Sequence, residues 1–289
     1  IGERVATVDL KRILRNIILE RDDRSWGPNN TFRFPRRGGT GSIWQALANR
    51  LPVKKVLYNK QVARIDVRHR VIFFTDKTHA TYDQLISTIP LNSLLAKTQV
   101  STYRPAIKKF HNSTVHIIGI GLRGQAPDHL KTKCWMYFPE QNCPFYRATV
   151  FSNYSQFNVP LPGRQWSMIM EVSESKYKPV NKNLIVQDAI RGLINTKLIT
   201  SRSHIVSIWH HSEEYGYPTP WLGRDMVVDP LLRALEKKHI YSRGRFGAWK
   251  YEVSNQDHSL MQGVEVVNRL LKQGHEITVW HPNIVNKKK

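Results

Sequence analysis

Apolar residues near the start of the chain recur at helical spacing. Between Glu3 and about Glu20 they fall three or four positions apart, which predicts an α-helix. A turn-rich stretch over residues 26–35 follows, and then a glycine-rich loop over residues 36–42. The loop opens a second amphipathic helix, for which Ser42 is the expected N-cap and Pro52 the stop. The apolar positions of this helix are Ile43, Trp44, Leu47, Ala48 and Leu51.

Short runs of β-branched residues come next and predict a β-meander. We expect strands at residues 53–58, 61–67 and 71–75, and a further buried strand within residues 82–90 that is stopped by Pro90. This order is common in glutathione-reductase-like flavoproteins, but any Rossmann-type domain can contain something similar. The meander therefore limits the possible fold classes more than it limits the possible functions.

A longer antiparallel sheet is predicted between residues 101 and 239. The expected strands cover residues 114–122, 134–138, 145–151, 167–172 and 205–209, and apolar spacing predicts a helix over residues 184–194. A last helix carries Leu260, Met261, Val264, Val267, Leu270 and Leu271 on one face, with Asp257 placed to cap it. Together these elements predict a mixed α/β fold of the α+β kind.

Composition and charge limit the class of protein. The 289 residues are 40% hydrophobic, enough to fill a core, and we find no apolar stretch long enough to cross a bilayer and no secretion signal. A soluble, cytoplasmic protein is expected, with Cys134 and Cys143 as free thiols rather than a disulfide. The net charge of +22 raises the possibility of nucleic-acid binding. The basic residues are spread along the chain without a zinc-finger or RNP-like motif, so nucleic acid is not the expected partner, and there is no metal motif.

Two segments suggest contact with an anionic or planar ligand. The glycines at 38, 39 and 41 lie before a helix N-terminus, whose free N–H groups attract anionic atoms, although a plain tight turn explains the glycines equally well. Residues 242–258 gather arginine, aromatic and amide side chains just before the last helix. Such a set suits the electron-rich pyrimidine end of a flavin.

Several long strings resemble eukaryotic-type UDP-galactopyranose mutases. Residues 26–44 read WGPNNTFRFPRRGGTGSIW and residues 242–259 read SRGRFGAWKYEVSNQDHS, with further matching strings at residues 134–155 and 171–181. The resemblance runs in order from Ile1 to about Pro282 and identifies the chain as the C-terminal portion of such an enzyme. The glycine motif G-x-G-x-x-G, which the family places earlier, is expected to lie before Ile1.

The resemblance implies a division of the chain into four parts. Residues 1–24 would end a helical substrate-binding domain, and residues 25–100 would form part of a glutathione-reductase-like FAD-binding domain. Residues 101–240 would form an antiparallel-sheet substrate domain, and residues 241–289 would return to the FAD-binding domain.

The resemblance also implies site residues. Arg4 and Arg147 would bind the pyrophosphate, which suits the guanidinium fork. The other substrate contacts would be Asn29, Tyr137, Tyr217 and Tyr251. The flavin contacts would be Gly38, Gly39, Val62, Arg245, Asn255 and Gln256. Ser254 departs from the family, which usually has glycine there.

The implied reaction isomerises UDP-galactopyranose to UDP-galactofuranose, with N5 of reduced FAD as nucleophile at the anomeric carbon and NADPH as the reductant. UDP-galactose would be the small-molecule partner, and a homo-oligomer or a separately supplied N-terminal half are possible protein partners. Two alternatives remain open: another amine-oxidase-like or desaturase-like flavoprotein, and a truncated, non-catalytic basic binding protein.

Overall fold

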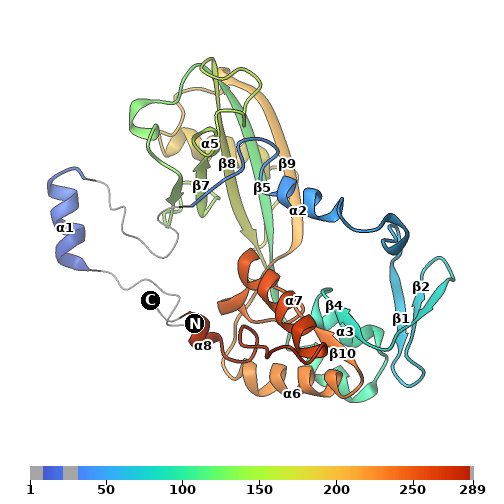
Figure 1. Cartoon of the computed structure of the whole chain (residues 1–289). Helices are drawn as coiled ribbons and strands as arrows, with labels where there is room; N and C mark the ends of the chain where they lie inside the picture. The colour runs from blue at the N-terminus through green and yellow to red at the C-terminus, as the bar shows by residue number, and fades with distance from the viewer. Residues whose placement is uncertain (1–8, 22–31, 287–289) are drawn as a thin grey trace. The chain divides into compact units, whose positions relative to one another are not determined.

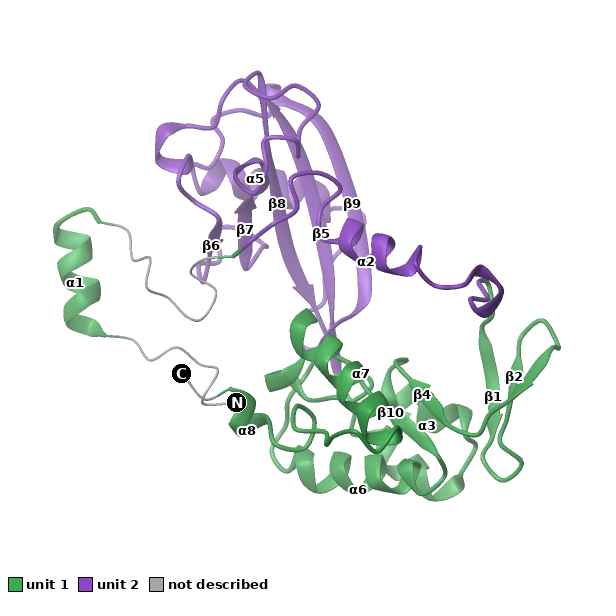
Figure 2. Ribbon diagram, viewed as in Figure 1, with its two compact units in different colours: residues 1–32, 59–111, 218–289 green, residues 33–58, 112–217 purple. Residues whose placement is uncertain are grey.

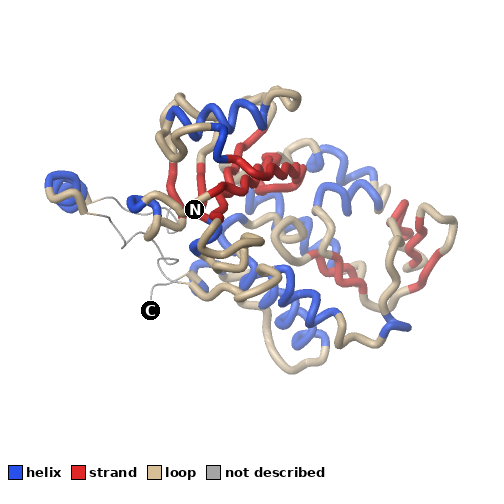
Figure 3. Tube along the Cα trace, turned by 90° about the horizontal axis from the view of Figure 1, so that it is seen from above, coloured by secondary structure: helices blue, strands red, loops and turns tan. Residues whose placement is uncertain are grey.

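The computed structural model describes residues 9–21 and 32–286, which form two compact units (Figures 1 and 2). Unit 1 contains residues 1–32, 59–111 and 218–289, and unit 2 contains residues 33–58 and 112–217. The chain therefore passes between the units more than once. Figure 3 shows the mixture of helices, strands and loops along the trace, and the mixed α/β fold predicted from the sequence is confirmed.

Unit 2 is built on one five-stranded sheet. Its strand order is β6-β7-β8-β5-β9, and β5 with β8, β8 with β7 and β7 with β6 pair antiparallel. The strands are β5 (Asn112–Arg123), β6 (Trp135–Tyr137), β7 (Arg147–Val150), β8 (Gln165–Glu174) and β9 (Ile205–Pro218). All five expected strands are present, and four of them differ from the prediction at their ends by three residues or fewer, while β9 runs on to Pro218.

One face of this sheet makes the core of unit 2. Along β5 every second side chain is buried, as the two-residue period of a strand requires, and Ile118, Ile120 and Leu122 share one face. Helix α5 (Ile185–Asn195) belongs to the same core cluster through Ile185, Ala189 and Leu193. The opposite face of the sheet is therefore available for polar groups.

Two local predictions in unit 2 are wrong. Residues 53–58 form no strand: Val53–Lys55 is a single 3-10 turn after Pro52, and Val53 is 87% exposed. β-Branched residues favour strands only where a pleated surface covers them. Ser42 also does not cap α2 (Gly41–Ala48), whose N-cap is Thr40. The Ser42 hydroxyl instead donates to the Gly39 carbonyl at 2.7 Å and closes the glycine turn.

Unit 1 contains a β-meander, a short parallel sheet and several helices. Strands β1 (Val62–Asp66), β2 (Val71–Phe74) and β3 (His79–Thr81) form the meander. Strand β4 (Leu85–Ser87) pairs in parallel with β10 (Ile240–Ser242). The helices are α1 (Leu10–Ile18), α3 (Leu91–Lys97), α4 (Arg104–Ile107), α6 (Arg224–Glu236), α7 (Gln256–Leu270) and α8 (Pro282–Val285). Short 3-10 turns lie at Ser101–Tyr103 and Tyr251–Val253. No helix within the described ranges has the length and apolarity that a bilayer crossing requires.

Buried ion pairs join the C-terminal elements of unit 1. The Arg243 guanidinium, just after β10, donates to the carboxylates of Glu236 and Glu276, and Arg269 of α7 contacts both carboxylates as well. A second pair links Arg224 at the start of α6 to Glu252. Burial raises the pKa of Glu252 and of Glu276, but the bonded arginines lower both pKa values by more, so each lies below its ordinary value.

Helix α7 differs from the prediction at its start. Asn255 occupies the N-cap position and no side chain caps the helix, so the proposed cap by Asp257 is wrong. Asp257 lies in the first turn instead, where its charge still complements the helix dipole.

Candidate functional site

Three strands of unit 2 place an arginine between a tyrosine and a glutamate. Arg147 on β7 lies opposite Tyr137 on β6 and opposite Glu171 on β8. Directly opposed residues on neighbouring strands project from the same face of a sheet. Its neighbour Ala148 belongs to the core cluster, so Arg147 projects from the face opposite the core.

Glu171 fixes the Arg147 guanidinium in place. Nε of Arg147 donates to Oε1 of Glu171 at 2.8 Å, and Nη2 donates to Oε2 at 2.7 Å. The Tyr146 hydroxyl donates to the same carboxylate at 2.6 Å. The two charged side chains are 21% and 14% exposed, so the pair is largely shielded from water yet open at one edge. This bidentate geometry holds the guanidinium in one orientation.

The electrostatics of this cluster favour fixed protonation states. Burial lowers the pKa of Arg147, but the charge and hydrogen bonds of Glu171 raise it by more, and the net pKa lies above its usual value. Burial, together with the bond to Glu171, raises the pKa of the Tyr146 hydroxyl. Arg147 therefore stays cationic, and Tyr146 stays a neutral hydrogen-bond donor.

Aromatic side chains surround Arg147. The rings of Trp135 and Tyr146 have centroids 5.5 and 5.9 Å from its guanidinium carbon, which is within cation–π range. Tyr137 hydrogen-bonds Arg147, and Tyr217 at the end of β9 is close enough to influence the pKa of Arg147. Tyr137 is 48% exposed and can meet a ligand. The structure thus brings together three residues expected at the substrate, Arg147, Tyr137 and Tyr217.

Three members of the cluster were not predicted as site residues: Trp135, Tyr146 and Glu171. Trp135 precedes Tyr137 by two positions on β6, so the two share a face. This two-residue spacing from Tyr137 could have identified Trp135 as a site residue from the sequence. Glu171 is opposed to Arg147 only through the β7–β8 pairing, which no local pattern reveals.

The glycine-rich loop of unit 2 turns sharply. Gly38 and Gly39 have φ of 78° and 62°, a conformation that glycine adopts without strain. A Cβ at Gly38 would lie 2.8 Å from Cβ of Ser42, so this position also lacks space for a side chain. The turn is consistent with a close backbone approach to a ligand.

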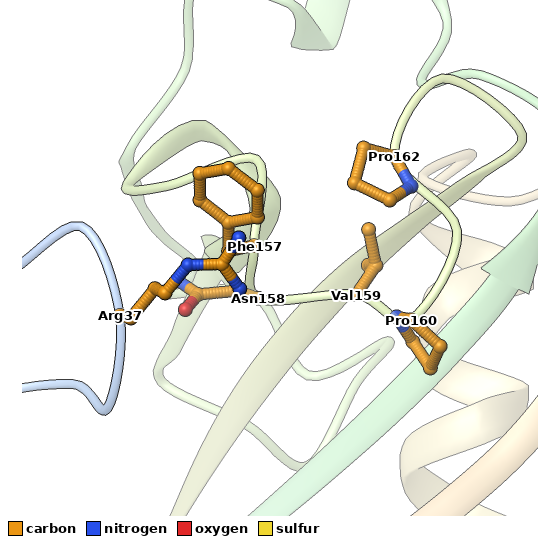
Figure 4. Close-up of a pocket in the computed structure, with 6 residues that line it drawn as sticks. All are labelled: Arg37, Phe157, Asn158, Val159, Pro160 and Pro162. Atoms are coloured by element: carbon orange, nitrogen blue, oxygen red, sulfur yellow. The ribbon is translucent and has the colours of Figure 1, made fainter.

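A surface hollow of about 680 Å³ lies beside this loop (Figure 4). The Arg37 guanidinium carbon is 3.7 Å from the centroid of the Phe157 ring, and that of Arg36 is 5.0 Å from it. The Ser155 hydroxyl donates to the Arg36 carbonyl at 2.6 Å and attaches the loop to the segment that follows β7. The remaining walls are Asn158, Val159, Pro160 and Pro162.

In unit 1 the expected flavin contacts Arg245, Asn255 and Gln256 lie around the start of α7. Nε of Arg245 donates to the Ser254 carbonyl at 2.9 Å. Asn255 is the N-cap residue and Gln256 is the first residue of the helix. Since no side chain caps this helix, its N-terminal amides and the Arg245 guanidinium gather positive potential around one short segment.

The other expected site residues are more widely placed. Tyr251 begins the 3-10 turn before α7, and its carbonyl accepts a hydrogen bond from Ser254 at 2.8 Å. Val62 begins β1, and its carbonyl accepts from Nζ of Lys97 at 2.6 Å. Arg4 and Asn29 lie outside the described residues. The expected flavin contacts are thus divided between the units, with Gly38 and Gly39 in unit 2 and the others in unit 1.

Known proteins match this chain over most of its length. The family model described as flavin containing amine oxidoreductase matches residues 5–218. A crystal structure of reduced UDP-galactopyranose mutase is 49% identical with a TM-score of 0.91. That match covers 98% of this chain, and the chain spans 62% of the mutase's length. The resemblance expected from the sequence strings is confirmed.

Two more distant structures share the fold alone. A putative protoporphyrinogen oxidase from Exiguobacterium sp. 255-15 is 11% identical with a TM-score of 0.58, and the match covers 70% of this chain and 45% of that one. A fatty acid isomerase from P. acnes is 15% identical with the same TM-score, and the match covers 80% and 52%. Since the family model covers more than half of the sequence, the chain belongs to the flavin containing amine oxidoreductase family.

Proposed function

We propose that this chain is part of a flavin-dependent UDP-galactopyranose mutase and that its Arg147 cluster binds the diphosphate of UDP-galactose. The observation that carries the proposal is the 49% identity to a crystallised mutase across 98% of the chain. It is supported by the preorganised arginine at the expected position.

The Arg147 cluster suits a diphosphate on chemical grounds. A guanidinium has five N–H donors, and the contacts to Glu171 use those on Nε and Nη2. Glu171 therefore orients Arg147 rather than consuming all of its donors. An oriented guanidinium binds phosphate oxygens with less loss of side-chain entropy than a free one. Glu171 is accordingly a positioning residue in this proposal.

The aromatic residues around Arg147 would complete the nucleotide-sugar site. Trp135 and Tyr137 share a face of β6, and their rings can pack against planar or sugar groups. The Tyr137 and Tyr217 hydroxyls can hydrogen-bond phosphate or sugar oxygens. These contacts would hold the sugar still while its ring opens and recloses, which lowers the entropic part of the barrier.

The residues of unit 1 fit a flavin. The uncapped start of α7 and the neighbouring Arg245 present hydrogen-bond donors and positive potential, which match the electron-rich pyrimidine edge of that cofactor. Asn255 and Gln256 would hold it there. When bound in its reduced form, FAD supplies a nitrogen nucleophile for covalent catalysis.

Calorimetric titration of the chain with UDP tests the diphosphate site. We expect Arg147→Ala to weaken UDP binding about 100-fold and Arg147→Lys about tenfold, because lysine keeps the charge but loses the fork. Arg191→Ala is the matched control, since Arg191 is an exposed arginine of the same unit, 71% exposed in a surface pair with Asp188. Equal effects of the Arg147 and Arg191 variants would overturn the assignment.

The flavin is tested separately. The visible absorption spectrum of the purified chain is recorded with and without added FAD, and again with UDP present. Retained flavin supports the cofactor site, and production of UDP-galactofuranose under reducing conditions then tests the reaction. A chain that binds FAD tightly but does not respond to UDP would favour a different flavoprotein activity.

A further inference from the structure

Two histidines face each other across β5 and β9, which are neighbours in the sheet of unit 2. His116 on β5 is fully buried, whereas His210 on the edge strand β9 is exposed. His116 comes two positions before Ile118 of the core cluster, so the pair lies on the face of the sheet that carries the core. Arg147 projects from the opposite face. The histidine pair is therefore separate from the Arg147 cluster.

Glu174, at the end of β8, fixes the tautomer of His116. Nε2 of His116 lies 2.8 Å from Oε2 of Glu174, and an ionised carboxylate can only accept, so Nε2 carries a proton. In the neutral ring the lone pair then lies on Nδ1, the nitrogen that faces His210. The same carboxylate oxygen is 3.5 Å from Nζ of the exposed Lys182. His116 thus presents an oriented nitrogen lone pair toward β9.

The spacing of the two facing nitrogens fits a metal ion better than a hydrogen bond. Nε2 of His210 lies 3.4 Å from Nδ1 of His116, whereas N–H groups donate to oxygen at roughly 2.7–3.2 Å. Two nitrogens bound to one tetrahedral zinc ion at about 2.0–2.1 Å each would lie about 3.3–3.4 Å apart. The ring planes differ by 26°, so the in-plane lone pairs of both rings can meet at one ion. A neutral His210 can carry its proton on Nδ1, which frees Nε2 as a ligand.

The contact between His116 and Glu174 is also typical of a metal-binding histidine. Such a histidine ordinarily donates its other ring N–H to a carboxylate, which orients the ring and raises its basicity. Within the described residues, no group of three or more His, Cys, Asp or Glu side chains could hold a metal ion. The protein therefore supplies two ligands here, and the exposure of His210 leaves the other coordination positions open to water.

We propose that His116 and His210 bind a zinc ion that clamps the edge strand β9 to β5, with Glu174 as the outer partner of His116. Imidazole nitrogen suits zinc, whereas Mg²⁺ prefers oxygen ligands. Strand β9 is exposed from Val206 to Glu214, so a clamp would hold a strand that little else covers. The two ligands are 94 positions apart, and no sequence motif would reveal them. The inference goes beyond the proposed function, because none of these residues belongs to the proposed UDP or flavin sites.

Calorimetric titration of the whole chain with ZnCl₂, with any histidine tag removed, tests the proposal. We expect the wild type to bind one ion per chain and His210→Asn, a change at an exposed position, to lose this binding step. His211→Asn is the matched control, since His211 is the next residue on β9, also exposed, and projects from the other side of the strand, where its ring stacks on Trp209. It should bind zinc like the wild type. Glu174→Gln should weaken binding about tenfold, as the loss of an outer partner does at other metal sites, and MgCl₂ should not bind.

Hydrogen exchange locates the ion. Zinc should slow amide exchange in residues 205–214 of the wild type but not of His210→Asn, because an ion that bridges β5 and β9 suppresses opening of the edge strand. Absence of zinc binding by the folded wild type would overturn the proposal, as would full binding by His210→Asn or binding that leaves β9 unprotected. Equal losses in His210→Asn and His211→Asn would also overturn it, since zinc would then be bound by exposed histidines in general. The titration contains neither UDP nor FAD, so its result is independent of the proposed reaction.

Discussion

The buried ion pairs of unit 1 allow a quantitative prediction for Glu276→Gln. The side chains of Arg243 and Glu276 are each 1% exposed, and Arg269 also donates to Glu276 at 2.6 Å. The substitution removes the negative charge and turns an amide NH₂ group toward arginine donors. Breaking a buried pair on one side costs about 3–5 kcal/mol. Since Glu236 still pairs with Arg243 at 2.5 Å, we expect the lower end, about 3 kcal/mol.

Hydrogen exchange read by mass spectrometry is a suitable assay, because it isolates unit 1 in a chain with two units. A loss of about 3 kcal/mol should make amides of residues 240–250 exchange about 100-fold faster. Asp188→Asn is the control, since it breaks an exposed ion pair with Arg191 at 3.3 Å in unit 2. Its acceleration of hydrogen exchange should stay near twofold. An acceleration below about threefold in folded Glu276→Gln would refute the reasoning, because it would mean that the second carboxylate compensates almost fully.

Three further predictions follow from single contacts. Glu171→Gln should weaken UDP binding about tenfold in calorimetry, because it loosens the arginine that it orients; an unchanged Kd would contradict that role. The lowered pKa of Glu252 means that its ion pair contributes stability above about pH 4.5, and this contribution is lost as the pH falls through the lowered pKa. The difference in Tm between wild type and Glu252→Gln should therefore shrink on acidification, and a difference independent of pH would argue against the pair. Gly247→Ala should cost about 3 kcal/mol or more in urea unfolding, since a Cβ there would lie 2.1 Å from a backbone oxygen of the same loop. Gly263→Ala, with open space around it in α7, should instead stabilise by about 0.5–1 kcal/mol, and similar effects at the two glycines would be inconsistent with this difference.

Periodicity predicted the regular elements of unit 2 well. The alternation of apolar and polar residues along 114–122 correctly predicted β5, because one face of that strand is packed and the other is not. It failed at residues 53–58, where the β-branched residues lack a covering surface. In unit 1, the periodicity of apolar residues did not predict α6. This helix begins after Gly223, which lies in the left-handed region, and contains Pro230, and both residues weaken a helical pattern.

The candidate site was only partly accessible from the sequence. The matching strings placed Arg147 and Tyr137 at the substrate, and the β6–β7 pairing sets them opposite each other. Glu171 opens the matching string at residues 171–181, but its role was not predicted, because its contact with Arg147, 24 positions away, depends on the register of β7 against β8. The apolar residues of the last helix were visible as a pattern, but the structure leaves Leu260, Met261, Val264 and Val267 exposed and buries Gln262, which bonds Gly244 and Val253.

The discontinuous composition of unit 1 has a consequence for folding during synthesis. Residues of unit 2 end at Tyr217, whereas unit 1 needs residues 218–289 for its core and for β10. Gln84 and His239, which flank the β4–β10 pair, are 155 positions apart. We therefore expect unit 2 to become protease-resistant on the ribosome first, which limited proteolysis of arrested nascent chains can measure. Helix α3 can already contact β1 through the bond from Lys97 to the Val62 carbonyl, but β4 lacks its paired strand until β10 is made. Strand β4 is therefore the part of this segment that most needs protection from aggregation while translation continues.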